Sequence, residues 1–185
     1  MSDRPSALHR QLVDGIPNLR AFAMSLCGNS ARADDLVQET LLKAWDKIES
    51  FEQGTNFKAW LFTILRNTFL SEQRKRKREI ADSDGHLSSR LAVHPEQFGH
   101  MDMCDFLAAL QQLPRDQREA LLLVGAEGFS YEEVASISGC AVGTIKSRVN
   151  RARVHLCQIL GLQNIADFGP DHYSAALASK DPLRV

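Results

Sequence analysis

The chain has 185 residues, of which 44% are hydrophobic and 24% are charged, and its formal net charge at pH 7 is -1. This length allows one or two domains with a small core each, and no apolar run approaches the roughly 20 residues that cross a bilayer. The four cysteines are widely spaced and form no Cys-x-x-Cys pair, which argues against a zinc site and against a disulfide framework.

Residues 6–28 are predicted to be helical. Apolar residues recur every three or four positions, at Leu8, Leu12, Ile16, Leu19, Phe22 and Leu26, which is the period of one helix face. Pro17 interrupts this pattern and is expected as the first residue of a second helical segment, where a missing amide hydrogen is tolerated. Gly28 then ends the segment, and Asn29 or Ser30 offers a cap for the next helix.

The next predicted helix spans residues 31–48 and has two different faces. Its apolar stripe consists of Leu36, Val37, Leu41, Ala44, Trp45 and Ile48. The other faces carry polar and acidic side chains, which are Asp34, Asp35, Gln38, Glu39 and Asp46. Composition alone indicates an ordinary amphipathic helix with a solvated acidic side.

A short polar break at residues 50–55 precedes a third helix, for which Thr55 or Asn56 is the expected cap. Phe51 lies in this break, where an aromatic ring can stack on an unpaired base with a gain of about 1–3 kcal/mol. The helix runs into five successive cations, Arg74, Lys75, Arg76, Lys77 and Arg78. Such a run repels itself and gains when it meets phosphate, although a solvated helix end is the alternative interpretation.

Residues 80–100 lose helical periodicity and are predicted to be a flexible linker. Some twenty residues can extend over about 70 Å, so domains on either side can contact DNA more than one turn (about 34 Å) apart. Helical patterns resume over residues 101–113, which Pro114 ends, and over residues 115–125. Residues 163–185 have only weak apolar spacing.

Residues 130–156 are predicted to form a helix-turn-helix. Ser130 and Glu133 have capping-box spacing, and Gly139 is suited to end the first helix. Residues 134–166 contain four cations and no acid. On the second helix Lys146, Asn150 and Arg153 line one stripe with Ser147 and Arg151 beside it, a mixture of base-edge readers and phosphate binders. A solvated basic helix is the alternative, but the combination favours DNA binding.

Taken together, residues 6–160 resemble a bacterial RNA polymerase sigma factor of the extracytoplasmic-function (ECF) class. The first group of motifs is Asp34-Asp35-Leu36-Val37-Gln38-Glu39-Thr40 with Phe57-Lys58-Ala59-Trp60-Leu61 and Arg66-Asn67. The second is Gly143-Thr144-Ile145-Lys146-Ser147-Arg148 with Arg151-Ala152-Arg153. Residues 113–128 are similar to the general-stress subgroup, called EcfG.

The resemblance implies an all-α fold with two small helical domains. Sigma region 2 would span residues 1–79 and the helix-turn-helix region 4 residues 101–162, with the linker at 80–100 and a tail at 163–185. It also implies a factor without enzymatic activity or cofactor that binds promoter DNA and core RNA polymerase, through the clamp coiled coil of the beta-prime subunit and the flap of beta. A NepR-like anti-sigma factor would hold it inactive. Neither a membrane nor a small-molecule substrate is expected, and the absence of a signal sequence predicts a cytoplasmic protein.

The resemblance also assigns roles to individual residues. Those for polymerase binding are Asp35, Gln38 and Glu39. Those for capturing a flipped base of the minus-10 element are Phe51 and Asn67, with the cations Arg74, Lys75 and Arg76 nearby. Those for reading the minus-35 element are Lys146, Ser147, Asn150 and Arg151, whereas Arg148 and Arg153 would contact phosphate or support packing. Two positions depart from the family pattern: Asn150 replaces a large or basic residue, and Ala141 replaces a Ser or Pro.

Three other interpretations fit the residues less well. A sigma-like decoy would bind the anti-sigma factor and never DNA, but known decoys are fused to a receiver domain and need no basic recognition helix. A plain helix-turn-helix regulator would leave the Phe51 loop and the basic run unused. An enzyme is least expected, because no Ser/His/Asp, paired-carboxylate, phosphate-loop or metal spacing is found.

Overall fold

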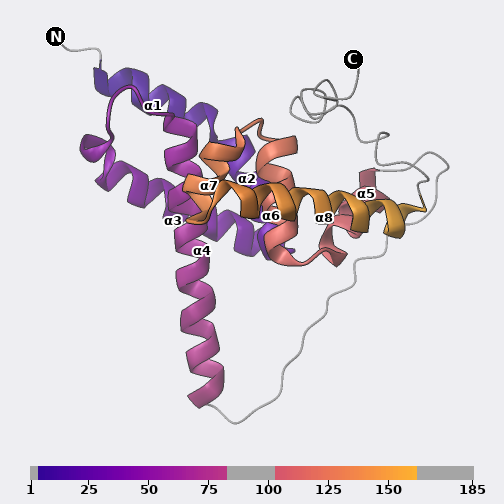
Figure 1. The fold of residues 1–185 in the computed structure, drawn as a ribbon. Coiled ribbons are helices and arrows are strands. Elements are labelled where there is room, and N and C mark those ends of the chain that lie inside the picture. The colour runs from indigo at the N-terminus through magenta and orange to yellow at the C-terminus, as the bar shows by residue number, and fades with distance from the viewer. Residues whose placement is uncertain (1–3, 83–102, 162–185) are drawn as a thin grey trace, which may run out of the picture.

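The computed structural model describes residues 4–82 and 103–161, and all regular secondary structure in these ranges is helical (Figure 1). The N-terminal lobe (residues 4–82) contains α1 (Arg4–Asp14), α2 (Ile16–Cys27), α3 (Ser30–Asp46), the 3-10 turn η1 (Ile48–Ser50) and α4 (Phe57–Asp82). The C-terminal lobe (residues 103–161) contains α5 (Met103–Gln112), α6 (Arg115–Gly125), α7 (Tyr131–Ser138) and α8 (Val142–Leu160). The predicted all-α fold is therefore confirmed. The predicted tail lies outside the described residues, as does the predicted linker except for residues 80–82, which continue α4.

The ends of the helices in the N-terminal lobe follow from local signals. Pro17 is the second residue of α2 rather than the first, and Gly28, with φ of 65°, ends that helix. The side chain of Asn29 accepts a hydrogen bond from the Arg32 amide at 3.0 Å and caps α3. Asn56 caps α4, because its Oδ1 accepts from the Ala59 amide at 3.2 Å. These caps satisfy amide groups that the first helical turn leaves without partners.

The core of the N-terminal lobe lies where α2, α3 and α4 meet. It consists of large side chains that are almost entirely buried, Leu19, Phe22, Leu36, Leu61, Phe62 and Leu65. The rings of Phe22 and Phe62 have their centroids 5.2 Å apart. Burying an apolar side chain of this size contributes about 1.5–3 kcal/mol each, so this cluster fixes the direction in which α4 leaves the lobe.

The two lobes pack directly against each other. Their buried apolar side chains form one continuous cluster that runs from Leu12 on α1 to Val149 on α8. The contact is made by α4 against α7 and by α2 against α6, and the rings of Phe62 and Phe129 meet edge to face with centroids 5.2 Å apart. The sequence had left the placement of the two domains open, and the structure shows them closed together.

Candidate nucleic-acid interface

Two local signals set the geometry of the helix-turn-helix. Ser130 Oγ accepts a hydrogen bond from the Glu133 amide at 3.1 Å, while Glu133 Oε2 accepts one from the Ser130 amide at 2.8 Å. This confirms the predicted capping box. Gly139 has φ of 63°, a left-handed conformation that residues with a Cβ atom seldom adopt. Ala141 precedes α8 and provides no side-chain cap.

The second helix of the predicted helix-turn-helix, α8, has one buried and one exposed face. Ile145, Val149, Ala152 and Leu156 are buried at spacings of four, three and four. Lys146, Asn150 and Arg151 are exposed, whereas Ser147 and Arg153 are half-buried. The Lys146 amine lies 5.8 Å from the centroid of the Tyr131 ring. An exposed basic face on a helix that its apolar face holds rigidly is the arrangement that enters a major groove.

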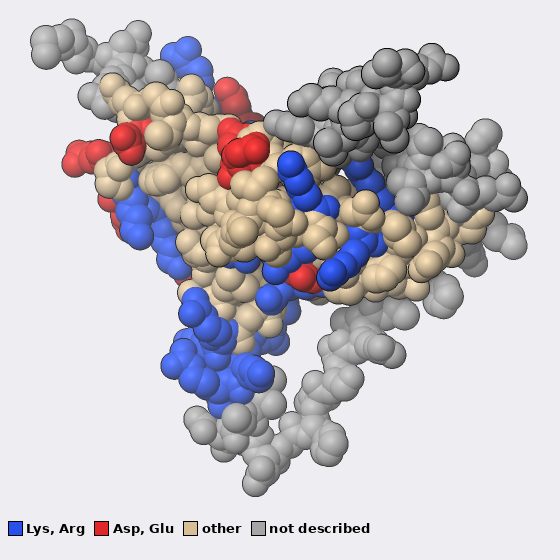
Figure 2. Space-filling view, in the orientation of Figure 1, with Lys and Arg blue, Asp and Glu red and all other residues tan. Residues whose placement is uncertain are grey.

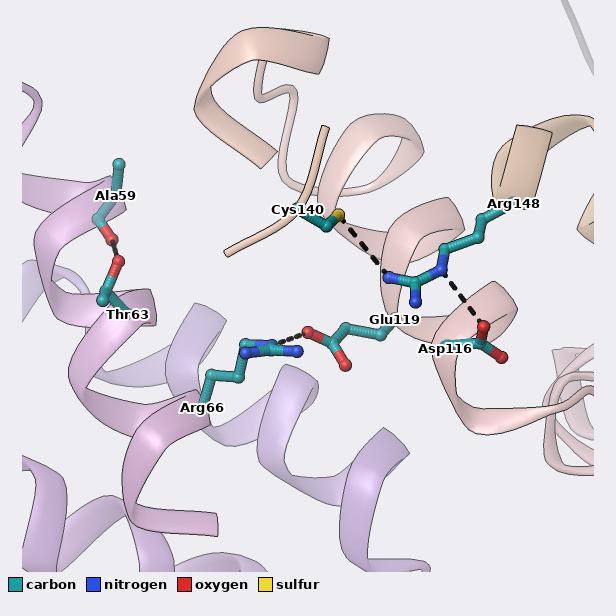
Figure 3. Close-up of polar contacts among 7 residues, drawn as sticks. All are labelled: Ala59, Thr63, Arg66, Asp116, Glu119, Cys140 and Arg148. Atoms are coloured by element: carbon teal, nitrogen blue, oxygen red, sulfur yellow. Dashed lines mark hydrogen bonds and ion pairs between the residues drawn. The ribbon is translucent and has the colours of Figure 1, made fainter. Parts of the chain in front are cut away.

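Arg148 belongs to the packing of the C-terminal lobe. Its Nε lies 3.1 Å from Asp116 Oδ2 of α6, and its Nη1 lies 3.7 Å from the sulfur of Cys140 (Figure 3). The side chain is thus engaged on the α6 side of α8. Of the two roles expected for Arg148, phosphate contact and packing support, the structure favours packing support.

Glu133 makes the stability of this region depend on pH. The hydrogen bond from Asn56, helped by Ser130 and opposed by burial, holds the pKa of Glu133 below its ordinary value of 4.5. Because the folded state lowers this pKa, the stabilisation is complete above the unfolded value and is lost as the pH falls through the folded value.

We expect the melting temperature of the wild type to fall more steeply between pH 6 and pH 3 than that of Glu133→Gln, in which the capping box can persist. Glu132→Gln, a neighbouring exposed acid, is the control. If the melting temperatures of Glu133→Gln and the wild type fell equally with pH, Glu133 would not be the source of this pH dependence.

The basic segment is part of α4 and extends beyond the body of the molecule (Figures 1 and 2). The side chains of residues 74–78 are all exposed. Successive residues of a helix are rotated by about 100°, so these five cations point in different directions around it. Asn67 and Arg74, seven residues apart, share one exposed side of α4, whereas Lys75 and Arg76 project from other sides.

The Phe51 loop borders an open hollow of about 830 Å³ between this loop, α1, α2 and the start of α4. Phe51 is half-buried, and its ring packs against Phe57 and Trp60 with centroids 5.0 and 5.5 Å away. The sequence suggested an isolated aromatic ring in the loop, whereas the structure holds this ring in an aromatic cluster. Asn67 is not among the residues that line the hollow, so the structure does not bring the two predicted base-capturing residues into one pocket.

The exposed face of α3 is more apolar than the sequence indicated. Asp35 and Gln38 are exposed as expected, but Leu42 and Trp45 on the same side are 68% and 57% exposed. The assignment of Trp45 to the buried stripe was thus wrong. Its indole stacks on the His9 ring of α1, with centroids 4.2 Å apart. Around the helix axis, position 42 lies between positions 35 and 38. This spacing could have shown from the sequence that Leu42 belongs to the same exposed face.

Glu39 is more constrained than Asp35 and Gln38, the other two residues of α3 that were predicted to bind polymerase. It pairs with Lys43 at 2.6 Å, and the Lys43 amine also donates to Thr68 Oγ1 on α4 at 3.2 Å. Lys43 holds the pKa of Glu39 below its usual value. Burial, together with the nearby Glu39 carboxylate, raises the pKa of Glu72. Within the described ranges, no group of three or more His, Cys, Asp or Glu side chains is placed to hold a metal ion.

Among the described helices, none is both long enough and apolar enough to span a membrane.

Comparison with known proteins finds a matching protein family for each lobe. The family described as Sigma-70 region 2 matches residues 13–79, and the family described as Sigma-70, region 4 matches residues 105–156. The chain is 58% identical over 165 residues to the ECF RNA polymerase sigma factor EcfG of Rhodopseudomonas palustris (strain TIE-1), which covers 89% of this chain and 91% of the relative.

Two solved structures are similar over most of the chain. One is the sigma factor RpoE in complex with the anti-sigma factor NepR from Bartonella quintana, with 56% identity and a TM-score of 0.75, covering 84% of this chain and 98% of that one. The other is the PhyRSL–NepR complex from Sphingomonas sp. Fr1, with 22% identity and a TM-score of 0.62, covering 89% and 96%. At this identity the second likeness shows the fold alone.

Proposed function

Because this chain belongs to the ECF class of RNA polymerase sigma factors, we propose that it binds core RNA polymerase and directs initiation at promoters whose minus-35 element is read by α8. Sigma factors supply promoter recognition and are not enzymes, since the polymerase makes the bonds. The observation that carries the proposal is the exposed face of α8, with Lys146, Asn150 and Arg151 on a helix fixed by four buried side chains. Arginine and asparagine recognise guanine and adenine edges in the major groove.

For the minus-10 element, we propose that the N-terminal lobe holds the opened strand. Extruding a base costs a few kcal/mol, and the hollow beside Phe51 is large enough to receive a small aromatic group. The aromatic cluster of Phe51, Phe57 and Trp60 supports a stacking role there. The side of α4 with Asn67 and Arg74 suits contact with the strand next to the captured base, with Lys75 and Arg76 contributing longer-range attraction to phosphate.

For the polymerase, we propose that the exposed face of α3 docks on the clamp coiled coil of the beta-prime subunit. Asp35 and Gln38 are exposed acceptors on this face, and Glu39 sits at its edge. Leu42 and Trp45 would add the apolar centre that protein interfaces need, because charged rims alone contribute little affinity. The C-terminal lobe would bind the flap of beta.

For regulation, we propose that a NepR-like anti-sigma factor holds the chain inactive in the cytoplasm, within a general stress response. The solved relative in complex with NepR supports this partner. The decoy interpretation is disfavoured, because the chain is 58% identical to a sigma factor over 89% of its length and keeps an exposed basic recognition face. A plain helix-turn-helix regulator does not account for the match of residues 13–79 to region 2.

Transcription with purified core polymerase tests the proposed function. We expect the wild type to start transcription from a cognate promoter, and Arg151→Ala to lose about 1–3 kcal/mol of discrimination at one base pair of the minus-35 element. Gln158→Ala, an exposed residue on the same helix beyond the predicted readers, is the matched control. The measurement is initiation from a set of promoters with single substitutions in that element. No transcription by the wild type would refute the function, and an unchanged preference would remove Arg151 from base reading.

A further inference from the structure

In the ion pairs between the lobes, each lobe contributes charges of one sign. Arg66 of α4 pairs with Glu119 of α6 (Figure 3), and the Lys58 amine of α4 lies 2.8 Å from Glu127 Oε2. In both ion pairs the cation comes from the N-terminal lobe and the acid from the C-terminal lobe. A third acid of the C-terminal lobe, Glu133, accepts a hydrogen bond from Asn56 Nδ2 at 2.7 Å.

The ion pair of Arg66 with Glu119 is largely removed from solvent, whereas the Lys58 side chain of the other pair is 38% exposed. The side chains of Arg66 and Glu119 are 16% and 6% exposed, and that of Glu127 is 7% exposed. Lys58 also donates to the Glu127 backbone carbonyl at 2.9 Å and lies 5.1 Å from the centroid of the Phe129 ring. Separation of the lobes would expose both cations to water, where they become available to another anion such as phosphate.

One of these cations lies within the surface proposed to hold the opened strand. Lys58, Asn18 and Asn56 all line the hollow beside Phe51, and all three contact acids of the C-terminal lobe, with Asn18 Nδ2 donating to Glu127 Oε2 at 2.9 Å. Arg66 directly precedes Asn67 on α4. The carboxylate of Glu127 thus lies next to a cation that borders the hollow, and that of Glu119 lies next to the cation that precedes Asn67.

We propose that Lys58 and Arg66 are binding residues for the phosphate backbone of single-stranded promoter DNA, and that Glu119 and Glu127 mask them in the closed chain. This inference rests on the proposed function, because it assumes that the N-terminal lobe holds an opened strand. In the closed chain the C-terminal lobe competes internally with DNA. When the lobes separate, carboxylate is exchanged for phosphate at both cations, so the loss of the two ion pairs is offset by the strand itself.

The proposal predicts the effect of neutralising Glu119 and Glu127, the two acids that cover the cations. In Glu119→Gln/Glu127→Gln the full chain should become more extended in small-angle X-ray scattering. It should also bind a fluorescent single-stranded oligonucleotide at least about fivefold more tightly, with a salt dependence steeper by about 0.7 per liberated cation. Adding Lys58→Ala and Arg66→Ala should abolish this gain. The matched control is Asp46→Asn/Glu132→Gln, which removes two exposed acids that lie outside these contacts.

A second variant covers the case in which the neutralised chain does not fold, which circular dichroism would reveal. Glu127→Gln alone frees one cation and should bind the oligonucleotide more tightly, with a salt dependence steeper by about 0.7, whereas Lys58→Glu/Glu127→Lys, which reverses the ion pair, should give no gain. Unchanged scattering and affinity in the neutralised variant, or equal tightening in the matched control, would overturn the proposal. Transcription by wild-type chain with core polymerase is a separate readout, so failure of the mask is distinguishable from failure of the proposed function.

Discussion

Replacing Phe62 with Ala should lower the free energy of unfolding by about 3–5 kcal/mol, the usual loss for a buried phenylalanine. Phe62 is 1% exposed, and its ring contacts Phe22 on one side and Phe129 on the other. Domains of this kind are stable by only about 5–15 kcal/mol, so the loss is a large fraction of the total. Urea unfolding followed by circular dichroism measures it. Phe51→Ala, at a half-buried ring, is the control and should lose less.

A double-mutant cycle with Phe129→Ala extends this prediction to the contact between the lobes. Because the two rings meet edge to face, we expect a coupling free energy of about 0.5–1.5 kcal/mol between the two substitutions. If the lobes were apart in solution, the two losses would simply add. A coupling of zero would therefore contradict the closed arrangement, even if Phe62→Ala alone behaved as expected.

The sequence predicted the helix ends well because the signals that set them are local. The capping box of Ser130 and Glu133 and the stop at Gly139 each depend on residues within a few positions. Gly28 and Asn29 mark the boundary between α2 and α3 in the same way. Such signals depend on backbone groups that each helix end leaves unpaired, and they act whatever packs on the helix later.

Long-range contacts could not be predicted from the same patterns. The pairing of Arg66 with Glu119 joins residues 53 positions apart, and no periodicity indicates which acid meets which cation. The packing of Phe51 on Trp60 was missed because a loop aromatic near a helix start gives no sign of its direction. Trp45 was assigned to the apolar stripe of α3 because of its spacing, yet among the described residues its side chain stays 57% exposed and stacks on His9.

The exposure of Trp45 needs an explanation, because a large apolar side chain left in water forgoes the gain from burial. It lies with Leu42 on the side of α3 that carries Asp35 and Gln38, so the apolar pair is surrounded by polar acceptors. This is the composition of a protein interface with an apolar centre and a polar rim. Trp is also the residue type most often found to dominate binding energy at such sites.

We therefore expect Trp45→Ala to weaken binding of the chain to core polymerase by about 2–4 kcal/mol, which is roughly 30-fold to several hundred-fold in the dissociation constant. Titration of labelled chain with core enzyme, followed by fluorescence anisotropy, measures this change. Val13→Ala, an apolar residue of α1 that is 60% exposed, is the matched control and should bind as the wild type does. Trp45→Phe keeps an aromatic ring for the stack on His9 and should recover part of the affinity. Equal binding by Trp45→Ala and Val13→Ala would mean that the polymerase does not cover this face, and that Asp35 and Gln38 act without an apolar centre.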